Sequence, residues 1–313
     1  MSQLFDKNEL FLEPKTTQYG SHMVMTNVHK PLKRKYVNID TKFRDEYNYN
    51  QTTNYNITLP ERITDVRTLT ITSIELPMSF YNISSSLGNN SFNVIYYGET
   101  GDTSDDVTYN IVIPDGEYDA AGLKTAINNK INMVGTGSAD LVYDVLNNKS
   151  QFYTKDESPS TFQIDFTVND TSVPDKYNLK SKLGWILGYR KPTYEINTSK
   201  PTSEFSIDLN GPRYLYLAIE EFNKGNQNSF ISPIAGSFIN KNIVARITLD
   251  KHNYGFGTVL PVNKLNGLLI SDVRSYTGKI DLMKLNVQIL NDIGNPLSLN
   301  GYDFSFCLEI DHD

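Results

Sequence analysis

The 313-residue sequence contains only one cysteine, Cys307, one tryptophan and four histidines. A single cysteine cannot form an intramolecular disulfide, which fits a chain that matures in a reducing compartment. Three histidines lie towards the ends, at His22, His29 and His312, so His252 alone remains in the body of the chain. The body of the chain therefore has too few histidines for a catalytic triad or a histidine-rich metal site to be expected. We interpret His252 as a polar loop residue.

The sequence also lacks long apolar runs and an excess of positive charge. No window approaches the roughly 18 apolar residues of a membrane-spanning helix, and the N-terminal residues do not combine a basic start with an apolar run. We therefore expect neither a secretory leader nor a membrane span. The net charge of −7 argues against a protein whose whole surface binds nucleic acid.

Motifs for catalysis and nucleotide binding are missing as well. The sequence has no Cys-X-X-Cys pair, phosphate-cradling glycine loop or nucleophile elbow. The adjacent Glu220 and Glu221 follow a predicted strand, where neighbouring side chains point to opposite faces, so they cannot flank one bond as a catalytic pair. We expect that the protein is not an enzyme and that it holds no cofactor and no metal ion.

What the sequence does contain is a repeated alternation of apolar and polar residues, which predicts β-strands bounded by turns. Clear examples lie at 55–59, 107–113, 162–168, 205–209, 283–289 and 304–310. Many short strands without strand–helix alternation favour an antiparallel arrangement over a parallel-sheet enzyme fold. We predict an all-β fold, an antiparallel β-sandwich that forms a single jelly roll.

One predicted strand changes its buried face along its length. Apolar residues lie at positions 69 and 71 and then at 74 and 76, so the alternation shifts by one residue between Thr72 and Ser73. Such a shift predicts a β-bulge or a bend that turns a corner of the sandwich. Proline has no N–H group for a sheet ladder, so we expect strands to end at Pro60 and at Pro77.

Only one segment has the spacing of an amphipathic helix. Asp119 can cap a run whose shared face consists of Leu123, Ala126, Ile127, Ile131 and Val134. The helix lies in residues 85–199, which are richer in Gly, Asp and Ser than their flanks. We interpret 85–199 as an inserted, mainly-β subdomain with one short helix, and 35–84 with 200–313 as the jelly roll.

Residues 1–34 show no sustained period, so we interpret them as an extended N-terminal arm. Basic side chains gather where this arm meets the first strand, at Lys30, Lys33, Arg34 and Lys35. They could bind phosphate groups of nucleic acid or lipid, or an acidic partner, by screened charge attraction. We favour a solvated or protein-contacting arm, with these four residues as the candidate contacts to a partner.

The single tryptophan, Trp185, lies among aliphatic residues between Gly184 and Gly188. Glycine allows a close approach of the backbone, so we interpret this segment as a compact core plug. An exposed aromatic patch for carbohydrate binding is the alternative interpretation.

Six segments together resemble a known family. They are KYVNIDTKFRDEY (35–47), NYNITLPERITDVRTLTITSIELPMSFYNISSSLGNNSF (54–92), IVIPDGEYDAAGLKTAIN (111–128), LGWILGY (183–189), GPRYLYLAIEEF (211–222) and DFSFCLEI (303–310). Their order over most of the chain resembles that in the penton and minor capsid proteins of nucleocytoplasmic large DNA viruses.

The resemblance implies a structural protein of the virion, assembled in the host cytoplasm. It implies a single jelly roll and homopentamers at the vertices of an icosahedral capsid. The partners would be other copies of the chain, the major capsid protein and minor capsid proteins. Nucleic acid or membrane would be contacted only through the N-terminal arm. The resemblance also implies that the chain has no enzyme active site.

Three alternatives stay open. A minor capsid or cement protein beneath or between capsomers could have the same fold and the same segments. A host-attachment, lectin-like capsid module could use the insertion 85–199 as its binding head. A sandwich-fold enzyme with a carboxylate site is the third alternative.

Overall fold

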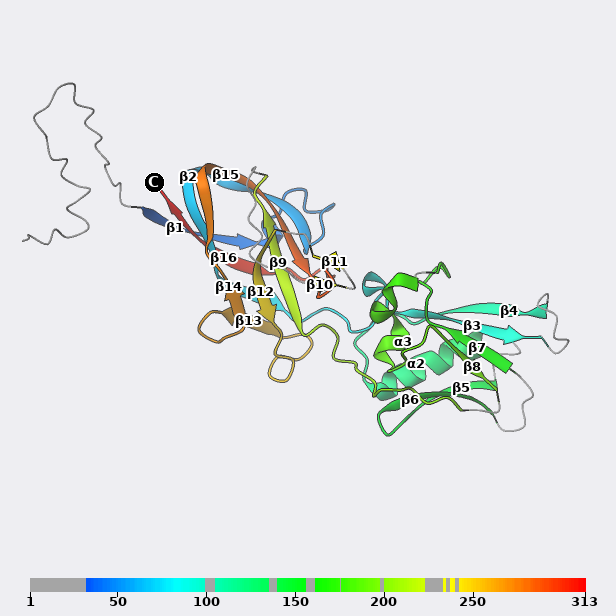
Figure 1. The fold of residues 1–313 in the computed structure, drawn as a ribbon. Coiled ribbons are helices and arrows are strands. Elements are labelled where there is room, and N and C mark those ends of the chain that lie inside the picture. Colours follow the sequence, from blue (N-terminus) through cyan, green and yellow to red (C-terminus); the bar gives the residue numbers. More distant parts are fainter. Residues whose placement is uncertain are drawn as a thin grey trace, which may run out of the picture.

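The computed structural model describes residues 32–98, 105–134, 140–155, 161–174, 176–197, 200–222, 233–234, 237–239 and 242–313. These residues form two lobes, a larger one of curled β-sheet and a smaller one of strands and helices (Figure 1). The chain is all-β with antiparallel, curled sheets in a jelly-roll-like fold, as the sequence predicts.

An eight-stranded sheet forms the larger lobe. Seven strands lie in the order β1-β16-β2-β15-β9-β12-β14, and β13 pairs with β2 beside this path. Their bounds are β1 Lys33–Asp40, β2 Asn54–Pro77, β9 Tyr214–Glu220, β12 Ile243–Thr248, β13 Val259–Asn263, β14 Leu269–Ser271, β15 Arg274–Leu290 and β16 Ser305–His312. A separate hairpin consists of β10 (Pro233–Ile234) and β11 (Ser237–Phe238).

Strand β2 changes its buried face where the sequence predicts. Ser73 lies opposite Cys307 of β16, and Ile71 lies opposite the next residue, Leu308, so Thr72 is the extra residue of a β-bulge. Beyond the bulge, β2 pairs with β13 in place of β15. The extra residue lets the strand turn with the curled sheet while apolar side chains on both sides of it stay buried.

The prediction that Pro60 ends a strand is wrong, because β2 continues through it to Pro77. The residues between Thr58 and Ile63, Pro60 among them, lie opposite a single residue of β15. Proline is tolerated in this bulge because its missing N–H group is not needed for the hydrogen-bond ladder between β2 and β15. Pro77 does end β2, as predicted.

The smaller lobe contains a four-stranded sheet of order β4-β3-β7-β8 and a hairpin of β5 and β6. The strand bounds are β3 Ser91–Tyr97, β4 Val107–Val112, β5 Leu141–Leu146, β6 Lys149–Thr154, β7 Thr161–Asp165 and β8 Thr193–Ile196. The helices are α2 Ala120–Met133 and α3 Leu183–Ile186, and the 3-10 helices are η1 Thr41–Phe43, η2 Ser85–Leu87 and η5 Lys176–Ser181.

Helix α2 confirms the helix that the sequence predicts. The Asp119 side chain accepts a hydrogen bond from the backbone N–H of Gly122 at 2.7 Å and so caps the first turn. Leu123, Ile127 and Ile131 are fully buried on the inner face. The spacing of three and four residues therefore identified both the helix and the face that packs into the core.

Each lobe has its own hydrophobic core. The buried residues of one cluster fall within 39–80 and 215–310, and those of the other fall within 83–196. Ile207 and Leu209 pack against the second cluster from its edge. The expected limits of the insertion, 85 and 199, stay a prediction.

Two details of the alternation pattern are wrong. Residues 205–209 form no strand, because their backbone crosses the smaller lobe as irregular chain, with Phe205 bonded to Gly188 and Ile207 bonded to Asn148. Met283 and Val107, which the pattern places on the apolar face of their strands, are 45% and 42% exposed. Within the described ranges, no helix combines the length and apolar character that crossing a membrane requires.

Candidate functional site

The structure places the described part of the basic segment in the first strand. Lys33, Arg34 and Lys35 are the opening residues of β1, so the strand begins inside the segment interpreted as the arm. Lys30 lies outside the described residues. The basic side chains therefore belong to the edge strand of the large sheet, next to β16.

Two of these cations are held by carboxylates of neighbouring strands. Arg34 lies 2.9 Å from Asp311 and 3.1 Å from Glu309, both in β16. Lys35 pairs with Glu61 of β2 at 2.5 Å. Their positive charges are thus largely compensated within the sheet, which weakens the case for phosphate binding by this pair.

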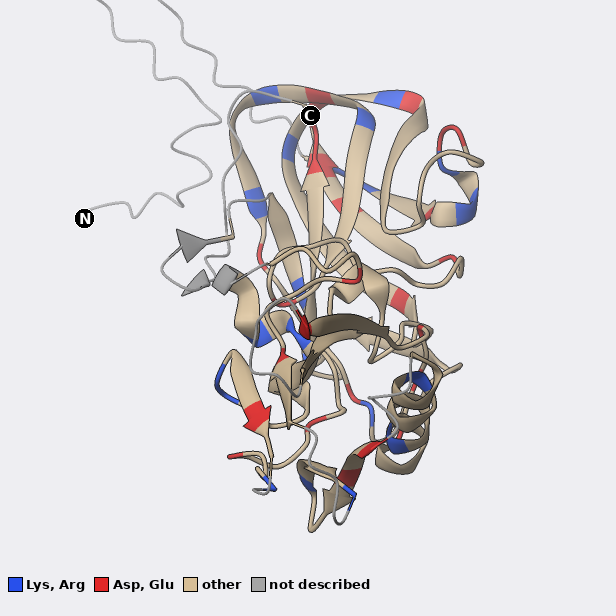
Figure 2. Ribbon diagram, turned by 90° about the vertical axis from the view of Figure 1, so that its right-hand side faces the viewer, with Lys and Arg blue, Asp and Glu red and all other residues tan. Residues whose placement is uncertain are grey.

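Further ion pairs extend this group at the end of the sheet where charged residues gather near the C-terminus (Figure 2). Asp313 lies 3.0 Å from Arg67 and 2.6 Å from Lys279. Hydrogen bonds from these two cations hold the pKa of Asp313 well below its usual range, and the bond from Arg34 lowers the pKa of Asp311. We call the ion pairs of Arg34, Lys35, Arg67 and Lys279 the terminal charge cluster.

An exposed aromatic loop follows β1. Phe43 is 70% exposed and Tyr49 is 88% exposed. Arg44 fixes this loop, since its guanidinium pairs with Asp303 at 3.0 Å and lies 3.9 Å from the centre of the Tyr47 ring. Aromatic side chains on a fixed backbone are typical contact groups of protein interfaces. We call Phe43, Tyr47 and Tyr49 the aromatic loop.

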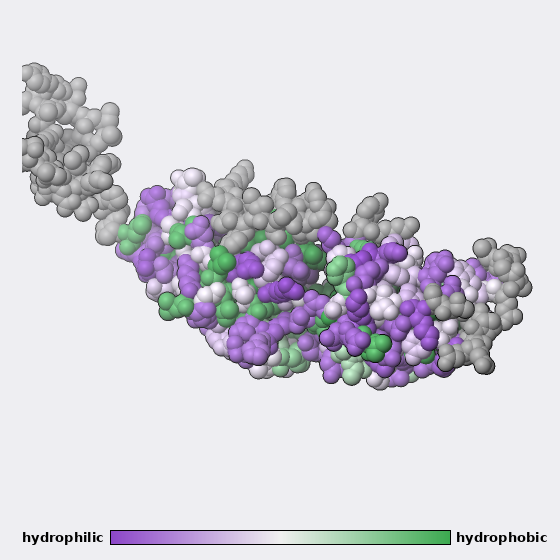
Figure 3. Space-filling model, turned by 60° about the horizontal axis from the view of Figure 1, so that its bottom comes forward, coloured by the Kyte–Doolittle hydropathy of each residue, from purple (hydrophilic) through white to green (hydrophobic). Residues whose placement is uncertain are grey.

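The surface view in Figure 3 shows apolar residues scattered among hydrophilic ones, with more of them over the larger lobe. Scattered apolar residues are normal on a soluble domain and identify no partner by themselves. The aromatic loop is therefore the better candidate for a protein contact, because its rings are exposed and Arg44 holds its backbone through the carbonyls of Tyr47 and Asn50.

A buried ion pair lies at the end of β9. Arg274 Nη1 is 2.6 Å from Glu221 Oε1, and neither side chain is more than 2% exposed. The Tyr276 hydroxyl donates to the same oxygen at 2.6 Å, and burial together with the Glu221 charge raises the pKa of this tyrosine. Glu220 is exposed, so the two adjacent glutamates meet different surroundings, as the sequence predicts. Such complete enclosure fits a structural role.

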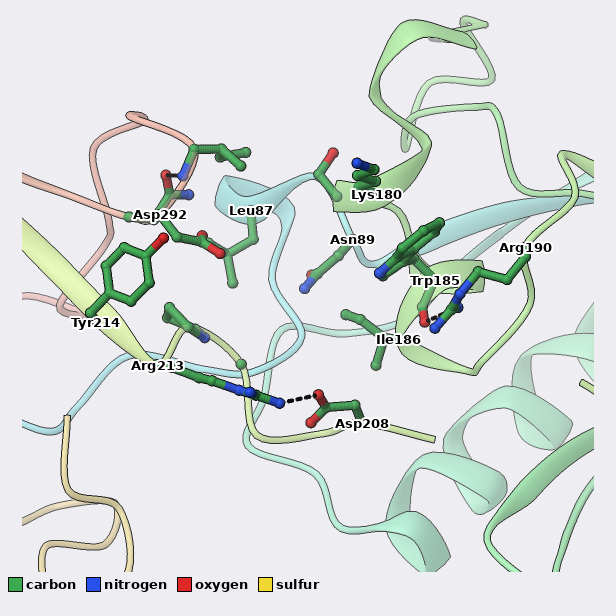
Figure 4. Close-up of a pocket in the computed structure, with 15 residues that line it drawn as sticks. Leu87, Asn89, Lys180, Trp185, Ile186, Arg190, Asp208, Arg213, Tyr214 and Asp292 are labelled. Atoms are coloured by element: carbon green, nitrogen blue, oxygen red, sulfur yellow. Dashed lines mark hydrogen bonds and ion pairs between the residues drawn. The ribbon is translucent and has the colours of Figure 1, made fainter. Parts of the chain in front are cut away.

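A cleft of about 340 Å³ opens between the two lobes (Figure 4). The smaller lobe supplies Trp185 and Arg190, whereas Arg213, Tyr214 and Asp292 come from the start of β9 and the loop after β15. Segments far apart in the sequence thus form this cleft, and no single stretch of sequence indicates it.

The segment around Trp185 is a core plug only in part. Leu183 and Leu187 are fully buried, and a Cβ atom on Gly184 would lie 2.4 Å from the Phe166 ring. Trp185 is half-buried and lines the cleft instead. The spacing explains this: positions 183 and 187 lie one helical turn apart on one side, and position 185 falls on the other side.

The described residues contain no group of three or more His, Cys, Asp or Glu side chains that could hold a metal ion. His252 lies exposed in the loop after β12. The position fits its interpretation as a polar loop residue.

No protein-family model matches the sequence, and a search of curated proteins found no match. Among solved structures, the chain is similar to the crystal structure of the selenomethionine-labelled mavirus penton protein, with a TM-score of 0.40 and 11% identity. The alignment covers 90% of this chain and 100% of that one. At this score and identity, the likeness carries no argument about function.

Proposed function

We propose that this chain is a structural protein of an icosahedral virus shell. It closes into homopentamers at the vertices, contacts the major and minor capsid proteins there, and acts by association without enzymatic activity. One observation carries the proposal. The segments 35–47, 54–92, 211–222 and 303–310, which resemble the penton and minor capsid family, supply most of β1, β2, β9 and β16 in one curled sheet.

A ring of identical subunits needs two different surfaces that fit each other at a constant rotation. The aromatic loop offers one such surface, because Arg44 fixes its backbone and its rings are exposed. It lies directly after β1, the edge strand of the sheet. We assign the contact between neighbouring subunits to this loop.

The solution mass of the purified chain tests the pentamer. We expect sedimentation velocity and native mass spectrometry to give five times the chain mass of 35.5 kDa. A chain that begins at residue 32 keeps β1 intact and should give the same stoichiometry. A monomer, both alone and mixed with the major capsid protein, would contradict the proposal.

A double variant, Phe43→Ser with Tyr49→Ser, tests the aromatic loop. Loss of two exposed rings from the contact should weaken the pentamer at least tenfold while the monomer stays folded. Leu265→Ser is the matched control, since Leu265 is 100% exposed in the turn after β13. Equal pentamer stability in both proteins would show that the contact lies elsewhere.

The location of the chain in virus particles distinguishes a vertex protein from the alternative, a minor capsid or cement protein. Gold labelling or subtomogram averaging should find the chain at the five-fold vertices. Labelling only between or beneath capsomers would support the minor capsid protein instead.

A further inference from the structure

The cleft between the lobes is lined by polar and charged side chains, some of which the fold uses only in part. Asn89 and Asn291 line it, but their side chains bond to their own loops and shape the walls. Asp292, in contrast, has no ion pair within the described ranges, and Arg213 reaches Asp208 only at 3.5 Å. Asp208 also accepts two hydrogen bonds from Asn210 through Oδ1, and Asp292 accepts hydrogen bonds from the backbone of its own loop. The hydrogen-bonding capacity that these two carboxylates and Arg213 retain is available to a ligand.

Trp185 gives the cleft an apolar wall of fixed orientation. The Arg190 guanidinium lies 3.9 Å from the centre of the indole and donates to the Trp185 carbonyl at 3.0 Å. The indole N–H has no hydrogen-bond partner among the described residues, and in Figure 4 its nitrogen lies on the side towards Asn89. A fixed aromatic ring with a free donor suits a ligand that has both apolar and hydroxyl groups.

The charges around the cleft are of both signs. Lys180, Arg190 and Arg213 contribute positive charge, and Asp208 and Asp292 contribute negative charge. These charges largely offset each other, so the lining has no strong net preference for an anion or a cation and accommodates a neutral ligand with several hydroxyl groups. The surrounding walls limit the hydration of Asp292 and raise the pKa of its carboxyl group, although this residue is accessible at the rim.

We propose that this cleft binds a neutral sugar residue. The apolar C–H groups of the sugar pack against the accessible part of Trp185. Its hydroxyls donate to Asp292 and Asp208 and accept from Arg213. A volume of about 340 Å³ lies at the lower end of the roughly 300–1,000 Å³ range of small-ligand sites and suits a mono- or disaccharide. This activity goes beyond the assembly role and does not depend on it.

Saturation-transfer NMR on the full chain tests the site with the methyl glycosides of glucose, galactose, mannose and N-acetylglucosamine. At least one glycoside should give signals with the wild type. Trp185→Ala and Asp292→Asn should each weaken its affinity about tenfold, because the first removes the apolar wall and the second replaces a charged hydroxyl acceptor with a neutral, weaker one. Trp185→Phe keeps an aromatic wall and should retain most of the affinity.

Asp170→Asn is the matched control for the carboxylate, because Asp170 is exposed on the smaller lobe outside the cleft. Its affinity should equal that of the wild type, and thermal unfolding verifies that each variant is folded. Absence of signals with all four glycosides would overturn the proposal. Equal signals from the wild type and the Trp185→Ala variant would overturn it too, as would binding of a neutral peptide but of no glycoside.

Discussion

Arg274 and Glu221 form an ion pair in the interior of the larger lobe. Arg274 also donates to the carbonyls of Ile219 and Asn242, at 3.1 and 3.3 Å, so one side chain links the end of β9 to the chain before β12. The free energy of desolvating two charges is about as large as the free energy gained from their attraction. Removing either residue, however, leaves the other as a buried charge without a partner. The cluster therefore specifies how these strand ends meet more than it adds to stability.

The variant Arg274→Met tests this role at the scale of one residue. It leaves Glu221 as a buried charge without its cation, and we expect the free energy of unfolding to fall by about 3–5 kcal/mol. Urea denaturation followed by circular dichroism measures the change. Adding Glu221→Leu should recover part of the loss because the stranded charge is gone. A double variant less stable than Arg274→Met would contradict this account.

Among the structural elements, β1 has a backbone ladder only with β16 in the part of the sheet that the structure describes, and the terminal charge cluster reinforces that attachment. Hydrogen bonds from cations lower the pKa of Asp311, Asp313 and Glu61. A carboxylate whose pKa is lower in the folded state contributes stability above its unfolded pKa of about 4. That contribution is lost as the pH falls towards the folded pKa.

We therefore expect the thermal midpoint of the protein to stay level between about pH 7 and 5 and to fall progressively below about pH 4. Arg34→Gln removes two pairs of the cluster and should make the fall shallower. Lys264→Gln, an exposed lysine in the turn after β13, should leave the curve unchanged. Identical acid profiles for the Arg34 variant and the wild type would refute the coupling. High salt should also flatten the curve.

Elements whose pattern depends on their own residues could be predicted from the sequence. Strand β16 and helix α2 have regular apolar spacing, and both form as expected. The continuation of β2 through Pro60 depends on a bulge opposite β15, a partner more than 200 residues away. The irregular path of 205–209 likewise depends on backbone bonds to the smaller lobe. The strand propensity of a segment does not indicate which distant segment will pair with it.

The candidate site was predictable only in its parts. The sequence singled out Trp185 and the basic run before Tyr36, but it did not place either among its neighbours. Ion pairing of Arg34 and Lys35 follows from the register of β1 with β16 and of β16 with β2. The cleft follows from how the two lobes meet, which no local pattern records.

In the whole molecule, the lobes meet where two connecting segments run side by side. Asn82 donates to the carbonyls of Tyr118 and Leu209, at 2.7 and 3.0 Å. Lys251 of the larger lobe donates to the carbonyl of Asn210 and lies 5.1 Å from the Phe80 ring centre. These contacts hold the two connecting segments together and so set the position of the smaller lobe relative to the larger one.

Lys251→Met should loosen this junction without unfolding either core. Loss of one charged hydrogen bond should speed amide exchange about fivefold or more in residues 115–118 and 207–211, and leave β16 unchanged. Hydrogen–deuterium exchange with mass spectrometry measures this, and Lys264→Met is the exposed control. Unaltered exchange at the junction would show that Asn82 and the backbone contacts suffice.

The same junction matters for how the chain can change through evolution. The outgoing segment at Asn82 and the returning segment at Gly211 are close enough that a Cβ on Gly211 would lie 3.8 Å from the Asn82 Cα. A segment whose two ends are neighbours can be enlarged, exchanged or deleted without moving the strands that flank it. A related chain could therefore have a different smaller lobe on an unchanged sheet.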